Sequence, residues 1–121
     1  RNLHNWLKAE ILMDVFNKSY AALKPGGIFG VVEHRALADS SLENMKKSGY
    51  VTEELTIEYA KKAGFILVAK SEINANPKDG TIHPKGVWTL PPSLRLGEEE
   101  KAKYIAIGES DRMTLKFMKP N

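Results

Sequence analysis

Apolar residues recur at helical spacing in the first part of the chain. They form two adjacent rows with a spacing of four residues, Leu7, Ile11 and Val15 in one and Leu12, Phe16 and Tyr20 in the other. The rows merge into one wide apolar face, which predicts a helix over residues 5–23. Asn5 is a plausible N-cap, and a start at Asn2 also fits. Pro25 and Gly26 end the helix, because proline cannot continue the hydrogen-bond ladder and glycine readily adopts positive φ.

The next segment, Ile28–His34, is apolar almost without interruption up to Val32. Such a run is typical of a strand that helices cover on both faces. Polar residues follow at its tip, where Glu33, His34 and Arg35 stand in sequence.

The clearest local pattern is a helix, a glycine and a second strand. Thr52 is the expected N-cap, and two glutamates in the first turn and two lysines in the last complement the helix dipole. Gly64 then closes the helix, and Phe65–Ile73 follows as a strand.

The remaining segments complete an α/β pattern in a single domain over residues 1–121. Ala36–Gly49 is expected to be a loop with a short helical turn, Asn74–Gly97 a long irregular loop, and Glu98–Ile107 a short helix. Arg112–Lys119 alternates apolar and polar residues and predicts a last strand. The first two strands should be parallel because a helical crossover joins them, and the last strand could insert antiparallel between them.

The composition of the chain excludes some kinds of chemistry and makes some kinds of partner unexpected. The 121 residues include no cysteine, which excludes disulfides, thiol catalysis and cysteine-bound zinc and fits a cytoplasmic location. No apolar run approaches the roughly 20 residues that span a bilayer, so no membrane partner is expected. The net charge of +3 is spread along the chain, and nucleic-acid binding is therefore not expected.

The run Leu23–Gly27 reads L-K-P-G-G and precedes an apolar strand. This pattern resembles the turn that leads into the fifth strand of class I S-adenosylmethionine-dependent methyltransferases. In that family a helix and a sixth strand follow, and a seventh, antiparallel strand lies between strands five and six. The segments in the corresponding places are Val51–Ala63, Phe65–Ile73 and Arg112–Lys119.

Further segments resemble a bacterial branch of predicted methyltransferases, and the resemblance covers almost the whole chain. These segments are Arg1–Trp6, Glu33–Ala36, Asn76–Asp79 and Ser110–Arg112. The resemblance implies the distal half of a Rossmann-like methyltransferase sheet, with three strands and flanking helices. It also implies S-adenosylmethionine as cofactor and methyl transfer to an unidentified acceptor.

The family binds its methyl donor mainly through a glycine-rich loop after the first strand and an acidic residue that ends the second. Neither has a counterpart in these 121 residues. We therefore expect the chain to correspond to a C-terminal portion of the family domain, with weak donor binding and little activity on its own.

The resemblance places the N-terminal residues at the lip where donor and acceptor meet. His4 is then a candidate general base, and Asn2 and Asn5 are candidate cofactor-binding residues. The alternative is a solvated helix start in which Asn5 only caps the helix.

Glu33 and His34 are candidate catalytic residues because α/β folds place ligands at the carboxyl ends of parallel strands. The two side chains could form an acid/base pair or contribute to a metal site; the alternative is an ion-paired strand end. Arg35, Asp79 and Arg112 are candidate substrate-binding residues, for which turn formation and ordinary ion pairs are the alternatives. His83 is expected to be an exposed loop residue.

A different class of function is also open. A half-sheet exposes unpaired backbone and apolar surface at the edge where further strands would pair. The sequence therefore also fits a non-enzymatic interaction module, and we expect a homo-oligomer formed through that edge.

Overall fold

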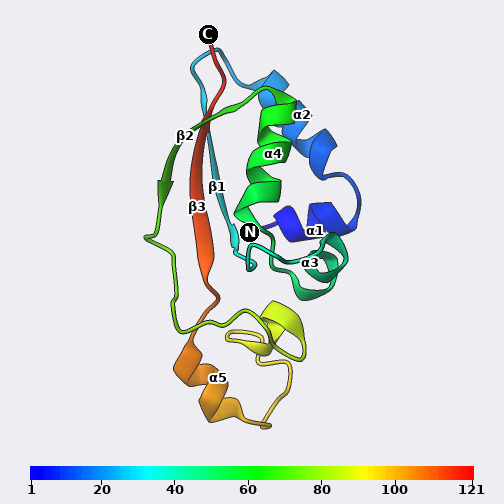
Figure 1. Cartoon of the computed structure of the whole chain (residues 1–121), viewed down its shortest axis with the longest axis vertical. Helices are drawn as coiled ribbons and strands as arrows, with labels where there is room; N and C mark the ends of the chain where they lie inside the picture. Colours follow the sequence, from blue (N-terminus) through cyan, green and yellow to red (C-terminus); the bar gives the residue numbers. More distant parts are fainter.

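A three-stranded sheet with helices packed against it forms the domain, and the computed structural model describes residues 1–121 (Figure 1). The N-terminal half contributes the helices α1 (Leu3–Lys8) and α2 (Leu12–Ala22), strand β1 (Ile28–His34), and the helices α3 (Leu42–Ser48) and α4 (Glu53–Ala63). The C-terminal half contributes strand β2 (Ile66–Ser71), the 3-10 helix η1 (Gly86–Thr89), helix α5 (Lys101–Ile107) and strand β3 (Arg112–Met118).

The strands follow the order β1-β3-β2, and β3 is antiparallel to both neighbours. The expected place of the last strand, antiparallel between the first two, is therefore confirmed. β1 and β2 run in the same direction but do not pair with each other, so every ladder in the sheet is antiparallel. The sheet thus lacks the parallel pairing of a Rossmann-like fold.

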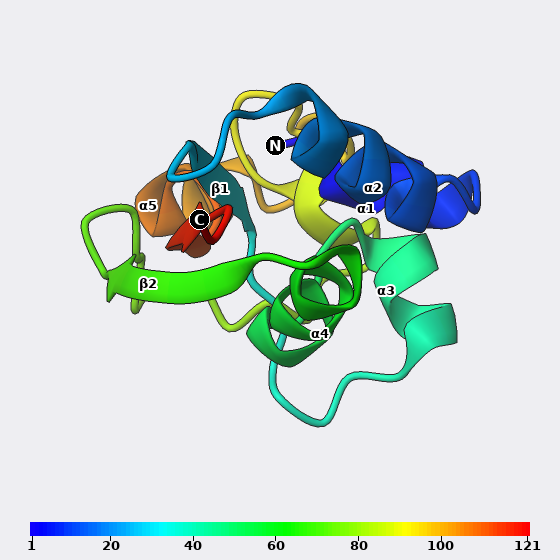
Figure 2. The same ribbon diagram turned by 90° about the horizontal axis from the view of Figure 1, so that it is seen from above.

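The helices α1 to α4 lie on one side of the sheet (Figure 2). Partners across an antiparallel ladder share a face, so Val31 and Leu115 point to the helices, whereas Ile28 and Met118 point to the open side. The prediction that helices cover β1 on both faces is wrong. Packing on one side needs apolar residues only at every second position of a strand. In β1 the positions between them are apolar as well, and Ile28 on the open side is 48% exposed.

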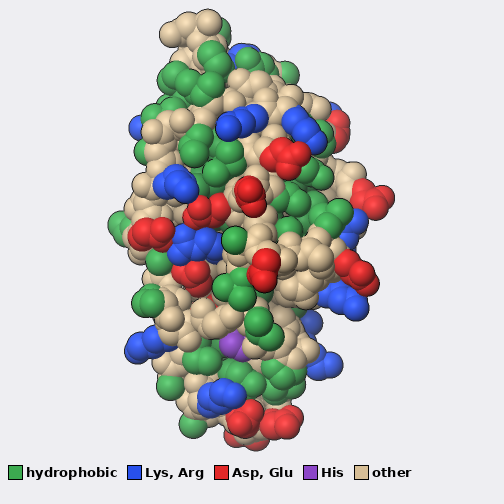
Figure 3. All heavy atoms as spheres, viewed as in Figure 1, with side chains coloured by type: hydrophobic (Ala, Val, Ile, Leu, Met, Phe, Trp, Pro, Cys, Tyr) green, Lys and Arg blue, Asp and Glu red, His purple; other side chains and the backbone are tan.

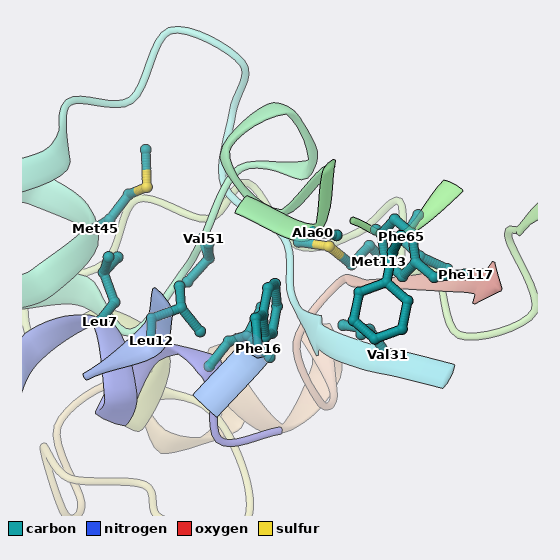
Figure 4. Packing of buried hydrophobic residues seen from close by; sticks show 12 residues of the cluster. Leu7, Leu12, Phe16, Val31, Met45, Val51, Ala60, Phe65, Met113 and Phe117 are labelled. Atoms are coloured by element: carbon teal, nitrogen blue, oxygen red, sulfur yellow. The ribbon is translucent and has the colours of Figure 1, made fainter. Parts of the chain in front are cut away.

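The hydrophobic core fills the space between the sheet and these helices (Figure 4). Aromatic rings form its centre: Phe29 stacks on Phe65 with centroids 5.0 Å apart, and Phe16 meets Phe29 edge-on at 5.5 Å. Phe117 of the central strand is fully buried beside them. Each well-oriented aromatic pair adds about 0.5–1.5 kcal/mol beyond the burial of its area.

The prediction of a single helix over residues 5–23 is wrong, because a turn separates α1 from α2. Glu10 adopts a φ of 62° at the break, and Ile11 is exposed rather than on the apolar face. The two helices have different partners: α1 packs against α3 and α2 against α4. Helix α1 begins at Leu3, with Asn2 at the N-cap position instead of Asn5.

Helix α4 matches its prediction. The Thr52 side chain accepts a hydrogen bond from the Leu55 amide, and Gly64 ends the helix with a φ of 112°. The segment predicted as a loop with a helical turn contains α3, which Ser41 caps in the same way. Local capping signals therefore define both helices.

The long segment between β2 and β3 extends past the carboxyl end of β1 and carries η1 and α5, at the bottom of Figure 1. Acidic and basic side chains alternate over the face in Figure 3, without a large area of one sign. None of the helices has the length and apolar character that crossing a membrane requires.

Candidate functional site

Glu33, near the carboxyl end of β1, is the centre of a buried polar cluster. Its side chain is fully buried, and its two carboxylate oxygens accept the backbone N–H groups of His4 and His34, each at 2.8 Å. The Nδ1 atom of His4 lies 3.0 Å from both oxygens. The structure therefore brings together the three residues that the sequence proposed as catalytic.

The fold holds this cluster from two directions. Glu33 pairs with Met113 across the ladder and points to the helix-covered side of the sheet. His4 stands in the first turn of α1, which Leu3 and Leu7 anchor in the core. The cluster thus joins the N-terminal helix to the end of β1.

The surroundings of Glu33 favour its carboxylate form. Burial alone would raise its pKa, but the hydrogen bond and charge of His4 and the two backbone amides outweigh burial and hold the pKa below its usual value. An ionised carboxylate only accepts, so Nδ1 of His4 is the donor, and Nε2 is the ring nitrogen that no protein group occupies. This is the arrangement of a general base and its orienting residue.

His34 lies beside the cluster and shares a hydrogen bond with Ser110 through Nδ1. Burial lowers the pKa of His34 to about 4; Glu33 opposes that shift, while His4, Arg112 and Arg1 add to it. His34 is therefore neutral at pH 7, a hydrogen-bonding group rather than a cation.

A pocket of about 150 Å³ adjoins His34. Polar and aromatic side chains from four regions of the chain line it, among them Arg1, His34, Trp88, Ser93, Ser110 and Arg112. The His4 ring lies 5.2 Å from that of His34 and 5.9 Å from that of Trp88, between centroids. The candidate base and the pocket are therefore neighbours.

Arg35 and Asp79, which the sequence also proposed for substrate, line a different and larger groove of about 580 Å³. The Arg35 guanidinium donates to both oxygens of Asp111, at 2.9 and 3.0 Å, and to Glu53 at 2.9 Å. These bonds, with one to Glu72, raise the pKa of Arg35. The ion pairs tie β1 to α4 and to the segment before β3.

Asp79 bonds only to groups of the protein. Its fully buried carboxylate accepts from the Tyr50 hydroxyl and from His83, each at 2.7 Å, and from the amides of Thr81 and Asp111. Burial would raise the pKa of Asp79, but these bonds keep it below its usual value. The prediction that His83 is exposed is wrong, because its side chain bonds to Asp79 and is only 8% exposed.

Asn2 and Asn5 are exposed on the first turn of α1, and the Asn5 amide donates to Asn2 at 3.1 Å. Their assignment to the cofactor, like that of Arg35, Asp79 and Arg112 to substrate, stays a prediction. Arg112 does line the pocket beside His34.

The sequence missed the role of Ser110 and Tyr50. Ser110 lies 76 positions from His34, and the Tyr50 ring packs edge-on to His34 at 6.2 Å. Ser110 reaches the site through the fold of the long segment, and Tyr50 lies between α3 and α4, so their contacts with His34 depend on tertiary structure.

One ligand atom from each of His4, Glu33 and His34 could face a metal ion, since these atoms lie within 4.8 Å of one another. Both oxygens of Glu33 already accept backbone N–H groups, which favours a hydrogen-bonded cluster.

Comparisons of the chain with protein-family models, with curated proteins and with solved structures found no match.

Proposed function

We propose that the chain is the C-terminal, acceptor-side part of a class I S-adenosylmethionine-dependent methyltransferase domain. The strand arrangement carries this proposal: an antiparallel strand lies between two strands that run in the same direction and are joined through the helices α3 and α4. The L-K-P-G-G turn stands directly before β1, as the resemblance requires.

The position of the polar cluster also supports this function. His4, Glu33 and the pocket beside His34 gather at the carboxyl end of β1, where open α/β sheets bind their ligands. A base held by a buried carboxylate at that edge suits an acceptor that must lose a proton.

S-adenosylmethionine supplies an electrophilic methyl group, and its sulfur keeps the bonding electron pair when the methyl group moves to a lone pair of the acceptor. In the proposed site, Nε2 of His4 takes the proton that the acceptor releases. Glu33 holds the His4 ring, and neutral His34 orients the acceptor by a hydrogen bond. The exposed amides of Asn2 and Asn5 face the donor.

The test uses the full-length product of the gene that encodes this chain. Calorimetric titration with S-adenosylmethionine should give a dissociation constant in the micromolar range. Glu33→Gln should retain donor binding but lose the transfer of tritiated methyl groups to a host-cell extract, since the neutral amide no longer stabilises protonated His4. Absence of donor binding would refute the proposal.

A second candidate is a self-associating interaction module, and the open face of the sheet favours it. Ile28, Ile66 and Val68 are 48%, 45% and 48% exposed, and the outer edges of β1 and β2 are unpaired within the chain. Burial of such a surface between two copies would remove apolar area from water.

Sedimentation at micromolar concentration tests this candidate. A dimer is expected, and Ile66→Lys should dissociate it. Ile82→Lys serves as the matched control, because Ile82 is 80% exposed in the long loop and away from the sheet. A folded monomer of the unaltered chain would exclude the candidate.

A further inference from the structure

Two arginines lie in the lining of the pocket beside His34. Arg1 and Arg112 contribute to its lining, together with the hydroxyls of Ser93 and Ser110, and no acidic side chain lines it. The charges of both arginines also act on His34, where they disfavour a second positive group. The pocket is therefore suited to an anion rather than a cation.

Arg112 has an unused hydrogen-bond donor at this place. Its Nε is the one buried side-chain nitrogen or oxygen in the chain without a hydrogen-bond partner. The Nη2 atom donates to the exposed Glu109 at 2.8 Å, so the guanidinium is only partly satisfied. Because Nε has almost no accessible surface, the guanidinium N–H groups outside it and outside the bond to Glu109 are the donors that a ligand oxygen can reach.

The rest of the lining suggests what lies next to the charged group. Trp88, Pro91 and Pro92 add apolar surface to a lining that also holds the serine hydroxyls and the guanidinium groups. The volume of about 150 Å³ holds a carboxylate or phosphate together with a small hydrocarbon part.

We propose that this pocket binds an anionic oxygen-bearing group, a carboxylate or a phosphate, of the molecule on which the protein acts. That this molecule is the methyl acceptor rests on the proposed function; the binding of the anion does not. Arg112 and Arg1 neutralise the charge, and the Ser93 hydroxyl donates a further hydrogen bond. Ser110 and neutral His34 share one hydrogen bond, so together they donate one more, either from the Ser110 hydroxyl or from Nε2–H of His34. These residues select the substrate and do not take part in bond making.

Binding is measured by titration of the full chain with benzoate and with phenyl phosphate, followed by NMR of the Trp88 indole N–H. Benzyl alcohol, which has a similar ring and no charge, is the neutral probe. Both anions, or one of them, should move the Trp88 resonance saturably, and the tighter of the two identifies the preferred group. Benzyl alcohol should not move it.

Two substitutions in the pocket lining test the inference, one by removing a positive charge and one by adding a negative charge. Arg112→Gln should weaken anion binding by about tenfold or more, because a charge-assisted hydrogen bond is lost. Ser93→Glu adds a repelling charge at an exposed position, so it tests the same pocket if Arg112→Gln does not fold. Arg95→Gln is the matched control, since Arg95 is an exposed arginine over the Trp88 ring and outside the lining.

A Trp88 resonance that neither anion moves would overturn the inference. Equal weakening by Arg95→Gln and Arg112→Gln would also overturn it, because the binding would then follow net charge alone. These outcomes are independent of donor binding: a protein that binds the anions but not S-adenosylmethionine loses the proposed function and keeps the anion site.

Discussion

Replacement of His34 by asparagine should flatten the dependence of stability on pH. The side-chain amide that His34→Asn introduces can reach Ser110 much as Nδ1 of the imidazole does. The variant therefore keeps the hydrogen bond and removes the titration. Its effect separates the protonation of His34 from the contacts that the side chain makes.

The magnitude follows from the two pKa values. The pKa of His34 falls from 6.5 to about 4 in the folded protein because burial disfavours the imidazolium. Between these values the unfolded chain binds a proton that the folded protein does not, so stability decreases as the pH falls from about 6.5 to about 4. The loss amounts to about 2 kcal/mol at pH 5 and about 3 kcal/mol once the pH is below 4.

Urea unfolding at pH 7 and at pH 5 measures the effect. The unaltered protein should lose about 2 kcal/mol more than the His34→Asn variant over this interval. Carboxylates such as Glu33 titrate in both proteins, and the comparison cancels most of their contribution. Equal losses in the two proteins would show that His34 is protonated as readily in the fold as in water, and would refute the reasoning.

Four further substitutions test the fold by the free energy of unfolding in urea. Gly86→Ala should cost more than about 2 kcal/mol, because φ is +59° and the new Cβ would lie 2.4 Å from the Ser48 carbonyl oxygen. Gly97→Ala, at φ +66° in open space, should cost only about 1 kcal/mol; equal costs would exclude the clash. Phe117→Ala should cost about 3–5 kcal/mol, and less than 1 kcal/mol would contradict its burial. Arg35→Met should cost about 2–4 kcal/mol because it removes the cationic partner of the partly buried Asp111 and one of the two that pair with Glu53, and unchanged stability would refute that role.

The elements that short-range signals define could be predicted from the sequence. The Thr52 cap and Gly64 define α4, and the alternation of Met113, Leu115 and Phe117 defines β3. Each signal acts within a few residues, so it needs no knowledge of the rest of the fold.

The features that tertiary contacts decide could not be predicted in this way. The break at Glu10 arises because α1 and α2 pack against different helices, although their apolar pattern is continuous. The open face of β1 depends on where the helices lie, and an apolar run alone does not reveal this.

In the candidate site, too, short-range signals could be predicted from the sequence and tertiary contacts could not. The position of Glu33 at a strand end could be read from the chain, but its contact with His4, 29 residues away, depends on how α1 returns to the sheet. The contacts of Ser110 with His34 and of Asp111 with Arg35 each join positions 76 residues apart. Arg35 and Asp79 lie in a separate groove, and Asp111 forms hydrogen bonds with both of them.

Titration of the full-length gene product with S-adenosylmethionine is the decisive experiment for the proposed function. We predict binding with a micromolar dissociation constant that Glu33→Gln leaves nearly unchanged, since Glu33 acts on the acceptor side. A folded full-length protein that releases no heat and shows no binding would contradict the assignment of this fold to a methyltransferase.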